Sequence, residues 1–256
     1  MNEHRCIITV GLEIGGRTPA ADILDDAGFD WTHSYGGPHW ENDATRVALR
    51  GVSAILAGSE HFDATTLEGT DALQAIARNG VGYDKIDLDY CTNRGIVVTY
   101  APGVMADAVA DLTFALLLAM VRHVATGDRA VKAGDYNVPI GEDLPSMTLG
   151  LLGCGRIGAE TVRRAKGFRM RVLVHDPFVD ADSLQQMGVE PVDRATLLAE
   201  ADAISLHVPL SADNANIVDA EFLGSMKRGS YLINTARGGL VDETALIDAL
   251  QSGQLA

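Results

Sequence analysis

Three glycines with a fixed spacing carry the clearest chemical signal in the sequence. Gly153, Gly155 and Gly158 stand in the order G-x-G-x-x-G, directly after the apolar run Leu149 to Leu152. That run indicates a buried parallel strand, and the residues from Arg156 to about Gly167 should form a helix. In such a motif the first glycine makes a tight turn, the second lets a pyrophosphate approach the backbone, and the third lets helix and strand pack closely. The motif predicts a phosphate-binding turn at a helix N-terminus.

An acidic residue follows at the distance that a dinucleotide site requires. Asp176 ends a second apolar run, Met170 to Val174, about 20 residues beyond the glycines. A carboxylate there accepts hydrogen bonds from a ribose and repels a 2′-phosphate, which favours NAD over NADP. Arg156, at the helix start, can add a charge-assisted bond to phosphate. The competing interpretations are a plain βαβ turn for the glycines and a solvated strand-end carboxylate for Asp176.

Two further segments place polar groups just past predicted strands, where parallel sheets bind ligands. Arg78 to Asp84, with the sequence RNGVGYD, follows the apolar run Leu73 to Ala77. A glycine-bracketed turn of this kind can direct backbone N–H groups at an anion, or it can serve only the path of the chain. Arg237 follows the strand Tyr231 to Asn234. Its guanidinium could hold a carboxylate through two hydrogen bonds, or it could be a solvated surface group.

The strands that position these residues form two groups. Strands alternating with helical stretches predict an α/β fold of two doubly wound parallel-sheet domains. We assign residues 1–101 to a flavodoxin-like substrate-binding domain and residues 102–256 to a Rossmann dinucleotide-binding domain, with Ala101-Pro102-Gly103 as the hinge. The second group contains at most five strands, counting one near Val189, whereas six are common in such domains. We therefore expect the C-terminal part of this domain to lie beyond Ala256.

The region after the hinge contains the longest apolar stretch. We expect one helix from about Met105 to Val124, followed by a polar loop from Gly127 to Pro145. Such a helix belongs to a core or to a subunit interface. Its apolar part, Leu112 to Val121, is about half the length that a membrane span needs.

Bulk properties exclude several classes of function. The formal net charge of −15 argues against nucleic-acid and anionic-membrane surfaces, which require basic patches. The three cysteines, Cys6, Cys91 and Cys154, are far apart and lack metal-ligand spacing. A sparse, odd set of cysteines and the absence of an apolar signal core near the N-terminus favour a soluble protein of the reducing cytoplasm, without a metal site.

Several motifs together resemble the D-isomer-specific 2-hydroxyacid dehydrogenases, with the phosphoglycerate dehydrogenase-like branch most similar. The resemblance extends over nearly the whole chain from about Leu73 onward, and its most specific block follows Asn234. The motifs are Gly-Cys-Gly-Arg-Ile-Gly from Gly153, His175-Asp176-Pro177, His207-Val208-Pro209-Leu210, and Asn234-Thr235-Ala236-Arg237-Gly238-Gly239-Leu240-Val241-Asp242-Glu243.

The resemblance implies a role for each site residue. Arg237 would be the catalytic arginine that binds the substrate carboxylate and polarises its carbonyl. The backbone of Asn79, Gly80, Val81 and Gly82 would hold the carboxylate, and Arg78, nearby, would be a further substrate-binding residue. Arg156 and Ile157 would meet the pyrophosphate, and Asp176 the adenosine ribose. The rest of the NAD cleft would be lined by Val81, His207, Val208, Pro209, Asn214, Thr235, Ala236 and Arg237.

The family also uses a histidine as general acid/base, oriented by a glutamate, because hydride transfer to a ketone leaves an alkoxide that needs a proton. None of the seven histidines stands in that motif, so we expect both residues beyond Ala256. His207 belongs to the strand-end pattern and is assigned a structural role. A homodimer through the helix 105–124 is a further implication.

The resulting hypothesis is an NAD-dependent oxidoreductase that acts at C2 of a small D-2-hydroxy or 2-oxo acid. Phosphoglycerate, hydroxypyruvate and glyoxylate all remain open, because Val104-Met105 departs from the phosphoglycerate-type pattern. The alternatives are a non-enzymatic NAD-sensing scaffold of the corepressor kind and a dehydrogenase of the formate or phosphite type.

Overall fold

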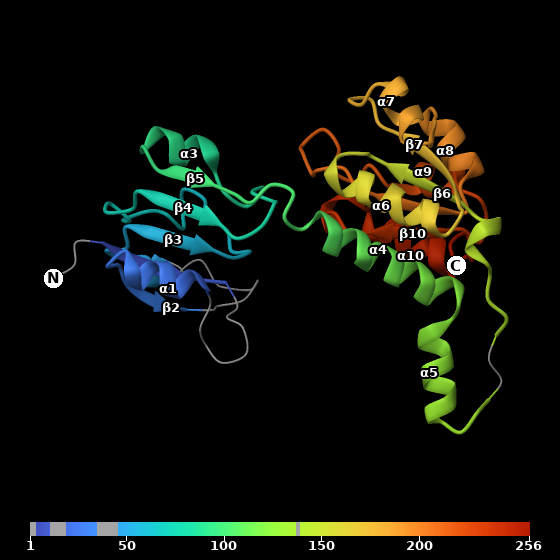
Figure 1. Ribbon diagram of the computed structural model, residues 1–256, viewed down its shortest axis with the longest axis horizontal. Helices are drawn as coiled ribbons and strands as arrows, with labels where there is room; N and C mark the ends of the chain where they lie inside the picture. Colours follow the sequence, from blue (N-terminus) through green and yellow to red (C-terminus); the bar gives the residue numbers. More distant parts are fainter. Residues whose placement is uncertain (1–3, 11–18, 35–45, 137–138) are drawn as a thin grey trace. The chain divides into compact units, whose positions relative to one another are not determined.

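The computed structural model describes residues 4–10, 19–34, 46–136 and 139–256. The chain divides into two compact units, Met1–Val104 and Met105–Ala256. Figure 1 shows a parallel sheet with flanking helices in each of them.

The first unit is built on five parallel strands in the order β2-β1-β3-β4-β5. This is the strand order of flavodoxin-like sheets. The strands stay parallel, but the order in which the chain adds them reverses between β1 and β3. Buried apolar side chains of the central strands, among them Ile7, Ile55 and Ile76, form the core. The described elements are β1 Arg5–Ile8, α1 Pro19–Asp26, β2 Asp30–His33, β3 Ala54–Ala57, β4 Ala75–Arg78, α3 Leu88–Asn93 and β5 Val97–Thr99.

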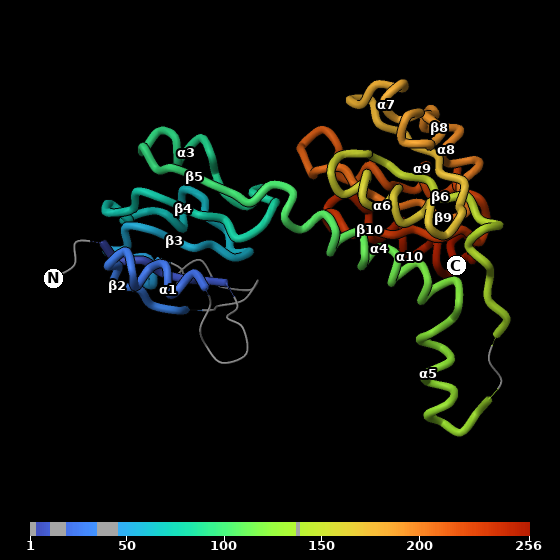
Figure 2. The backbone as a smooth tube through the Cα atoms, in the orientation of Figure 1, coloured from blue at the N-terminus to red at the C-terminus, as the bar shows by residue number. Residues whose placement is uncertain are grey.

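The second unit contains five parallel strands in the order β10-β9-β6-β7-β8. Counted from its first strand this is the Rossmann order, so the predicted pair of doubly wound sheets is confirmed. Figure 2 follows the chain through this unit. Its strands are β6 Thr148–Leu152, β7 Arg171–His175, β8 Glu190–Pro191, β9 Ala203–Leu206 and β10 Tyr231–Asn234. Its helices are α4 Ala106–Val121, α5 Val124–Lys132, η1 Leu144–Ser146, α6 Arg156–Gly167, α7 Ala181–Gln186, α8 Arg194–Glu200, α9 Ala220–Ser225, η2 Gly238–Leu240 and α10 Glu243–Gln251.

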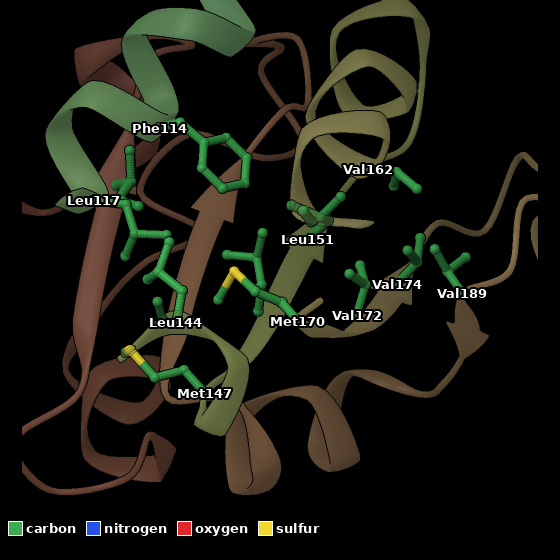
Figure 3. Close-up of a cluster of buried hydrophobic side chains, with 14 of the residues drawn as sticks. Phe114, Leu117, Leu144, Met147, Leu151, Val162, Met170, Val172, Val174 and Val189 are labelled. Atoms are coloured by element: carbon green, nitrogen blue, oxygen red, sulfur yellow. The ribbon is translucent and has the colours of Figure 1, made fainter. Parts of the chain in front are cut away.

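Alternating side chains of the central strand β6 supply two separate cores in this unit. Leu149 and Leu151 pack with residues of α4 and α6 on one face of the sheet, and Figure 3 shows this cluster around Phe114 and Leu117. Leu152 packs with residues of α8, α9 and α10 on the other face. Successive side chains of a strand point to opposite faces, so a helical layer covers each face of the sheet.

The predicted helix from 105 to 124 is wrong in its extent. His123 adopts a left-handed conformation with φ of 52°, and the helix ends at Val121. A second helix, α5, begins at Val124 and continues to Lys132, so part of the predicted loop from Gly127 is helical. Lys132 and Asp128, one turn apart in α5, form an ion pair of 2.9 Å that stabilises this helix.

No single helix among the described residues is long and apolar enough to span a bilayer, although α4 and α5, bent by 58° at their junction, reach that length and composition together.

Candidate active site

Parallel register brings four predicted site segments to one end of the second sheet. The last residues of four adjacent strands are aligned with one another, namely Leu152, His175, Leu206 and Asn234. The chain therefore leaves the sheet at the same level in β6, β7, β9 and β10. The first residues beyond it are Gly153, Asp176, His207 and Thr235. Ligands of open parallel sheets bind at this carboxyl end.

The three glycines of the fingerprint meet different surroundings. A Cβ on Gly153 would lie 2.8 Å from Cγ1 of Val208, and one on Gly158 would lie 2.7 Å from the carbonyl oxygen of Gly153. Gly153 also has a φ of 93°, where other residues are strained. A Cβ on Gly155 would meet nothing within 4 Å. The first and third glycines are thus required by the fold, whereas the second leaves open space beside the backbone.

The start of α6 provides donors for that open space. Gly155 is the N-cap and makes no side-chain capping bond. Within the described residues, the N–H groups of Arg156 and Ile157 have no hydrogen-bond acceptor. Unpaired N–H groups and the positive end of the helix dipole attract an anion. The exposed Arg156 side chain adds a full charge at the same place, so the turn fits a pyrophosphate.

Asp176 is tied to the glycine turn. Its Oδ2 accepts a hydrogen bond from the N–H of Cys154 at 2.7 Å, and its Oδ1 accepts one from the N–H of Phe178 at 2.8 Å. Each carboxylate oxygen can accept a further bond, so the half-buried group can still take two ribose hydroxyls. Burial, followed by the charge of Asp176, raises the pKa of the Cys154 thiol to about 11. The thiol therefore stays neutral and adds no negative charge to the turn.

His207 is a neutral residue at the end of β9. Its Nε2 lies 3.0 Å from Oγ of the buried Ser205. Burial lowers the pKa of His207 to about 4, because the charged imidazole would lose its hydration. At neutral pH the ring is therefore a neutral imidazole, and the imidazolium form that would donate a proton is not populated.

The segment after His207 is closed by one side chain. Asn214 donates from Nδ2 to the carbonyl oxygen of Pro209 at 2.6 Å and accepts at Oδ1 from the N–H of Ser211 at 2.7 Å. Val208 lies against Gly153. The structure thus gives Asn214 a loop-forming role at a position that the sequence assigns to the cofactor cleft.

Arg237 is held at the carboxyl end of β10 by its own segment. Asn234 accepts from the N–H of Ala236 at 3.0 Å through Oδ1 and donates from Nδ2 to the carbonyl oxygen of Arg237 at 2.7 Å. The half-buried Arg237 guanidinium donates from Nη1 to Ala236 at 2.9 Å. Asn234 belongs to a motif of the family resemblance, but no role was predicted for it. An asparagine that directly precedes a predicted ligand-binding turn is the signal that could have identified it.

Thr235, in the same turn after β10, is positioned by a side chain of helix α4. Its Oγ1 lies 3.1 Å from Oγ1 of Thr113, a fully buried residue of α4. This contact joins the turn after β10 to the helix that covers one face of the sheet.

The turn from Asn79 to Gly82 belongs to the first unit. It follows β4 directly, and the N–H of Asn79 donates to the carbonyl oxygen of Ala57 at 2.9 Å. In the described part of the chain no acceptor is paired with the N–H groups of Val81 and Gly82. Arg78 lies beside the turn and donates from Nε to the carbonyl oxygen of Gly82 at 2.9 Å. The turn is therefore shaped to offer N–H donors.

Comparisons with known proteins agree with this geometry. Residues 114–256 match the sequence model described as D-isomer specific 2-hydroxyacid dehydrogenase, NAD binding domain. A glyoxylate reductase of Korarchaeum cryptofilum is 43% identical over 77% of this chain and 61% of its own length. A D-3-phosphoglycerate dehydrogenase of Archaeoglobus fulgidus is 40% identical over 79% of this chain and 39% of its own length. The chain thus spans about three fifths or less of these two curated relatives.

A solved structure extends the similarity to the whole chain. The D-lactate dehydrogenase of Aquifex aeolicus, complexed with NAD and lactic acid, matches 98% of this chain and 74% of that one, with a TM-score of 0.84 and 31% identity. The family match and this neighbour confirm NAD as the predicted cofactor.

Gly155→Ala should separate cofactor binding from folding. The added methyl group meets no protein atom, so the free energy of unfolding should stay within about 1 kcal/mol of the original. The same methyl group would occupy the approach to the backbone, and the Kd for NADH should rise roughly tenfold or more. Fluorescence titration with NADH measures this. Gly224→Ala, also in open space but in α9, is the matched control, and equal NADH affinities of the two variants would contradict the assignment.

The neutral state of His207 predicts a pH dependence of stability. Its pKa is lower in the folded state than in the unfolded state, so the folded state binds fewer protons and loses stability as the pH falls from 6.5 toward about 4. At about 1.4 kcal/mol per pKa unit, the effect amounts to roughly 3 kcal/mol. Urea unfolding at pH 7 and pH 4.5 should show a smaller loss in His207→Gln than in the original protein. Equal losses in the two proteins would refute the neutral state of His207 in the folded protein.

Proposed function

The chain belongs to the D-isomer-specific 2-hydroxyacid dehydrogenase family, and from this premise we propose that it transfers a hydride between NAD(H) and C2 of a small D-2-hydroxy or 2-oxo acid. One observation carries the proposal: the glycine turn, Asp176 and the Arg237 segment leave one sheet at the same level. The proposed dinucleotide site and the proposed carboxylate-binding arginine would thus share one carboxyl end. The family acts on small acids of this class.

The cofactor would be held by the backbone more than by side chains. The N–H groups of Arg156 and Ile157 would bind the pyrophosphate, and Gly155 would let it approach. The carboxylate of Asp176 would accept the two ribose hydroxyls and disfavour a 2′-phosphate. When bound, NAD supplies the nicotinamide carbon that accepts or donates the hydride. Val208, Pro209, Thr235 and Ala236 would complete the cleft, while His207 and Asn214 would support its walls.

The substrate would be held by two kinds of hydrogen-bond donor, a charged guanidinium and backbone N–H groups. Arg237 would bind the carboxylate and polarise the adjacent carbonyl, so that negative charge developing on oxygen in the transition state is stabilised. The unpaired N–H groups of Val81 and Gly82 would bind the carboxylate as well. The reaction also needs a proton for the alkoxide oxygen. The low pKa of His207 makes it unsuitable as that donor, so we assign the role to another group.

Two finer points belong to the same proposal. Relatives of this chain carry the names glyoxylate reductase and D-3-phosphoglycerate dehydrogenase, and a substrate screen with glyoxylate, hydroxypyruvate and phosphohydroxypyruvate would decide between these acids. We also propose a cytoplasmic location, which the three free, buried cysteines support; fractionation of the source cells would test it.

We further propose a homodimer that uses α4 and α5. Leu112 and Leu116 are 52% and 40% exposed on α4, and α5, which extends away from its unit in Figure 1, contains no buried residue. Exposed apolar side chains on neighbouring helices are typical of a protein interface.

Replacing Leu112 and Leu116 by Asp should convert the dimer to a monomer, because two buried charges would have no partner. Sedimentation velocity measures the change in mass. Leu250→Asp, on a helix residue that is 50% exposed in α10, should leave the mass unchanged. A monomeric original protein, or a double variant that remains dimeric, would contradict this interface.

Arg237→Gln should remove a charged contact made to the reacting acid. The expected loss of transition-state stabilisation is roughly 3 kcal/mol, about a hundredfold in kcat/KM for the 2-oxo acid. The KM for NADH should change little. NADH absorbance in the full-length protein provides the assay. Arg228→Gln, where the arginine donates to the carbonyl of Ser252 at 2.8 Å, is the matched control. An unchanged kcat/KM in Arg237→Gln would refute the role.

A further inference from the structure

The turn from Asn79 to Gly82 is fixed from two sides by its neighbours in the first unit. The N–H of Asn79 donates to Ala57 at 2.9 Å, and that of Ala101 donates to the carbonyl oxygen of Gly80 at 3.0 Å. In a trans peptide the C=O and N–H groups point in opposite directions. Binding the Gly80 carbonyl therefore also directs the N–H of Val81.

The guanidinium of Arg78 binds two further carbonyl groups of the turn. Its Nε donates to the carbonyl oxygen of Gly82 at 2.9 Å, and its Nη1 donates to that of Asn79. These two oxygens belong to the peptide units at either end of the turn. The peptide unit with the N–H of Gly82 lies between them, held by its neighbours in the chain.

Gly80 shows how closely the guanidinium fits. The φ of Gly80 is 145°, a conformation that other residues rarely adopt. A Cβ at this position would lie 2.8 Å from Nη1 of Arg78. The absence of a side chain thus serves two ends, since it permits the turn and leaves room for the arginine against it.

We propose that Arg78 is a positioning residue, which holds the turn in the conformation that presents the N–H groups of Val81 and Gly82 to the substrate carboxylate. This inference rests on the function proposed above and replaces the direct substrate contact predicted for Arg78. With their oxygens bound to the guanidinium, Asn79 and Gly82 do not turn a carbonyl toward the carboxylate, which would repel it. The planar fork of arginine is essential, because lysine offers a point charge without two donors in fixed directions.

Arg94 provides a matched control in the same unit. It also links two carbonyl groups, donating from Nη1 to Leu67 and from Nη2 to Thr70, both at 3.1 Å. These carbonyls lie outside the turn. Arg94→Lys therefore removes an equivalent fork without changing the residues that would bind the carboxylate.

Amide hydrogen exchange tests the clamp without any assay of activity. The reporters are the N–H groups of Gly80 and Ala101, whose acceptors are the carbonyls of Arg78 and Gly80. In the full-length protein, Arg78→Lys and Arg78→Met should raise their exchange rates roughly tenfold or more, because the turn opens locally. Arg94→Lys should leave them unchanged. Exchange in Arg78→Lys at the original rate would overturn the proposal.

Kinetics with glyoxylate then test the positioning. Arg78→Lys and Arg78→Met should both raise the KM for glyoxylate roughly tenfold, with the KM for NADH unchanged, and Arg94→Lys should match the original protein. Near-normal KM in Arg78→Lys with a large rise in Arg78→Met would show that charge alone matters and would overturn the clamp. Absence of turnover of any 2-oxo acid by the original protein would count against the proposed function instead, while the exchange rates would still decide the clamp.

Discussion

The alignment of parallel strands in the second unit determines where its chemistry can occur. Gly153 donates to the carbonyl oxygen of His175 at 3.0 Å, and His207 donates to that of Leu152 at 2.8 Å. These bonds continue the ladder past the last strand residues and hold three strand ends at one level. Helices cover both faces, so the backbone groups beyond the ladder are the ones left for a ligand. A change of register in β6 would separate the glycine turn from Asp176 and from the Arg237 segment.

Much of this unit follows from local sequence patterns. The predicted bounds of β10, Tyr231–Asn234, agree with the structure, and helix α10 begins directly after its N-cap residue Asp242. In both cases short-range physics is sufficient: an apolar run forms a buried strand, and Asp242 caps the helix by accepting from the N–H groups of Thr244 and Ala245. In the first unit, the strand β2, Asp30–His33, was missed because it contains mostly exposed polar residues and is held by pairing with β1. Helix α5 was missed because Gly127 suggests a loop.

The site shows the same division between local and tertiary information. The roles of Gly153 and Gly158 were predictable, because a tight turn and a close helix contact recur wherever this motif occurs. The acceptor role of Asp176 toward Cys154 was not predictable, since it joins residues of two strands. Arg78 illustrates the limit most clearly. The family resemblance placed Arg78 at the substrate carboxylate, whereas the position of its guanidinium against Gly80 depends on a backbone conformation that residue types do not specify.

An acidic protein that binds an anionic cofactor must offset its own field. The chain has a formal net charge of −15, and several arginines of the second unit are engaged in ion pairs, such as Arg164 with Asp111 and Arg171 with Glu190. At the glycine turn, backbone dipoles supply the positive partial charge that attracts the phosphates, and they need no counter-ion. Neutral neighbours preserve that advantage, because burial keeps the Cys154 thiol protonated. Asp176 is an acidic group beside the turn. Its carboxylate oxygens accept hydrogen bonds from the N–H groups of Cys154 and Phe178, which reduces its repulsion of the phosphates.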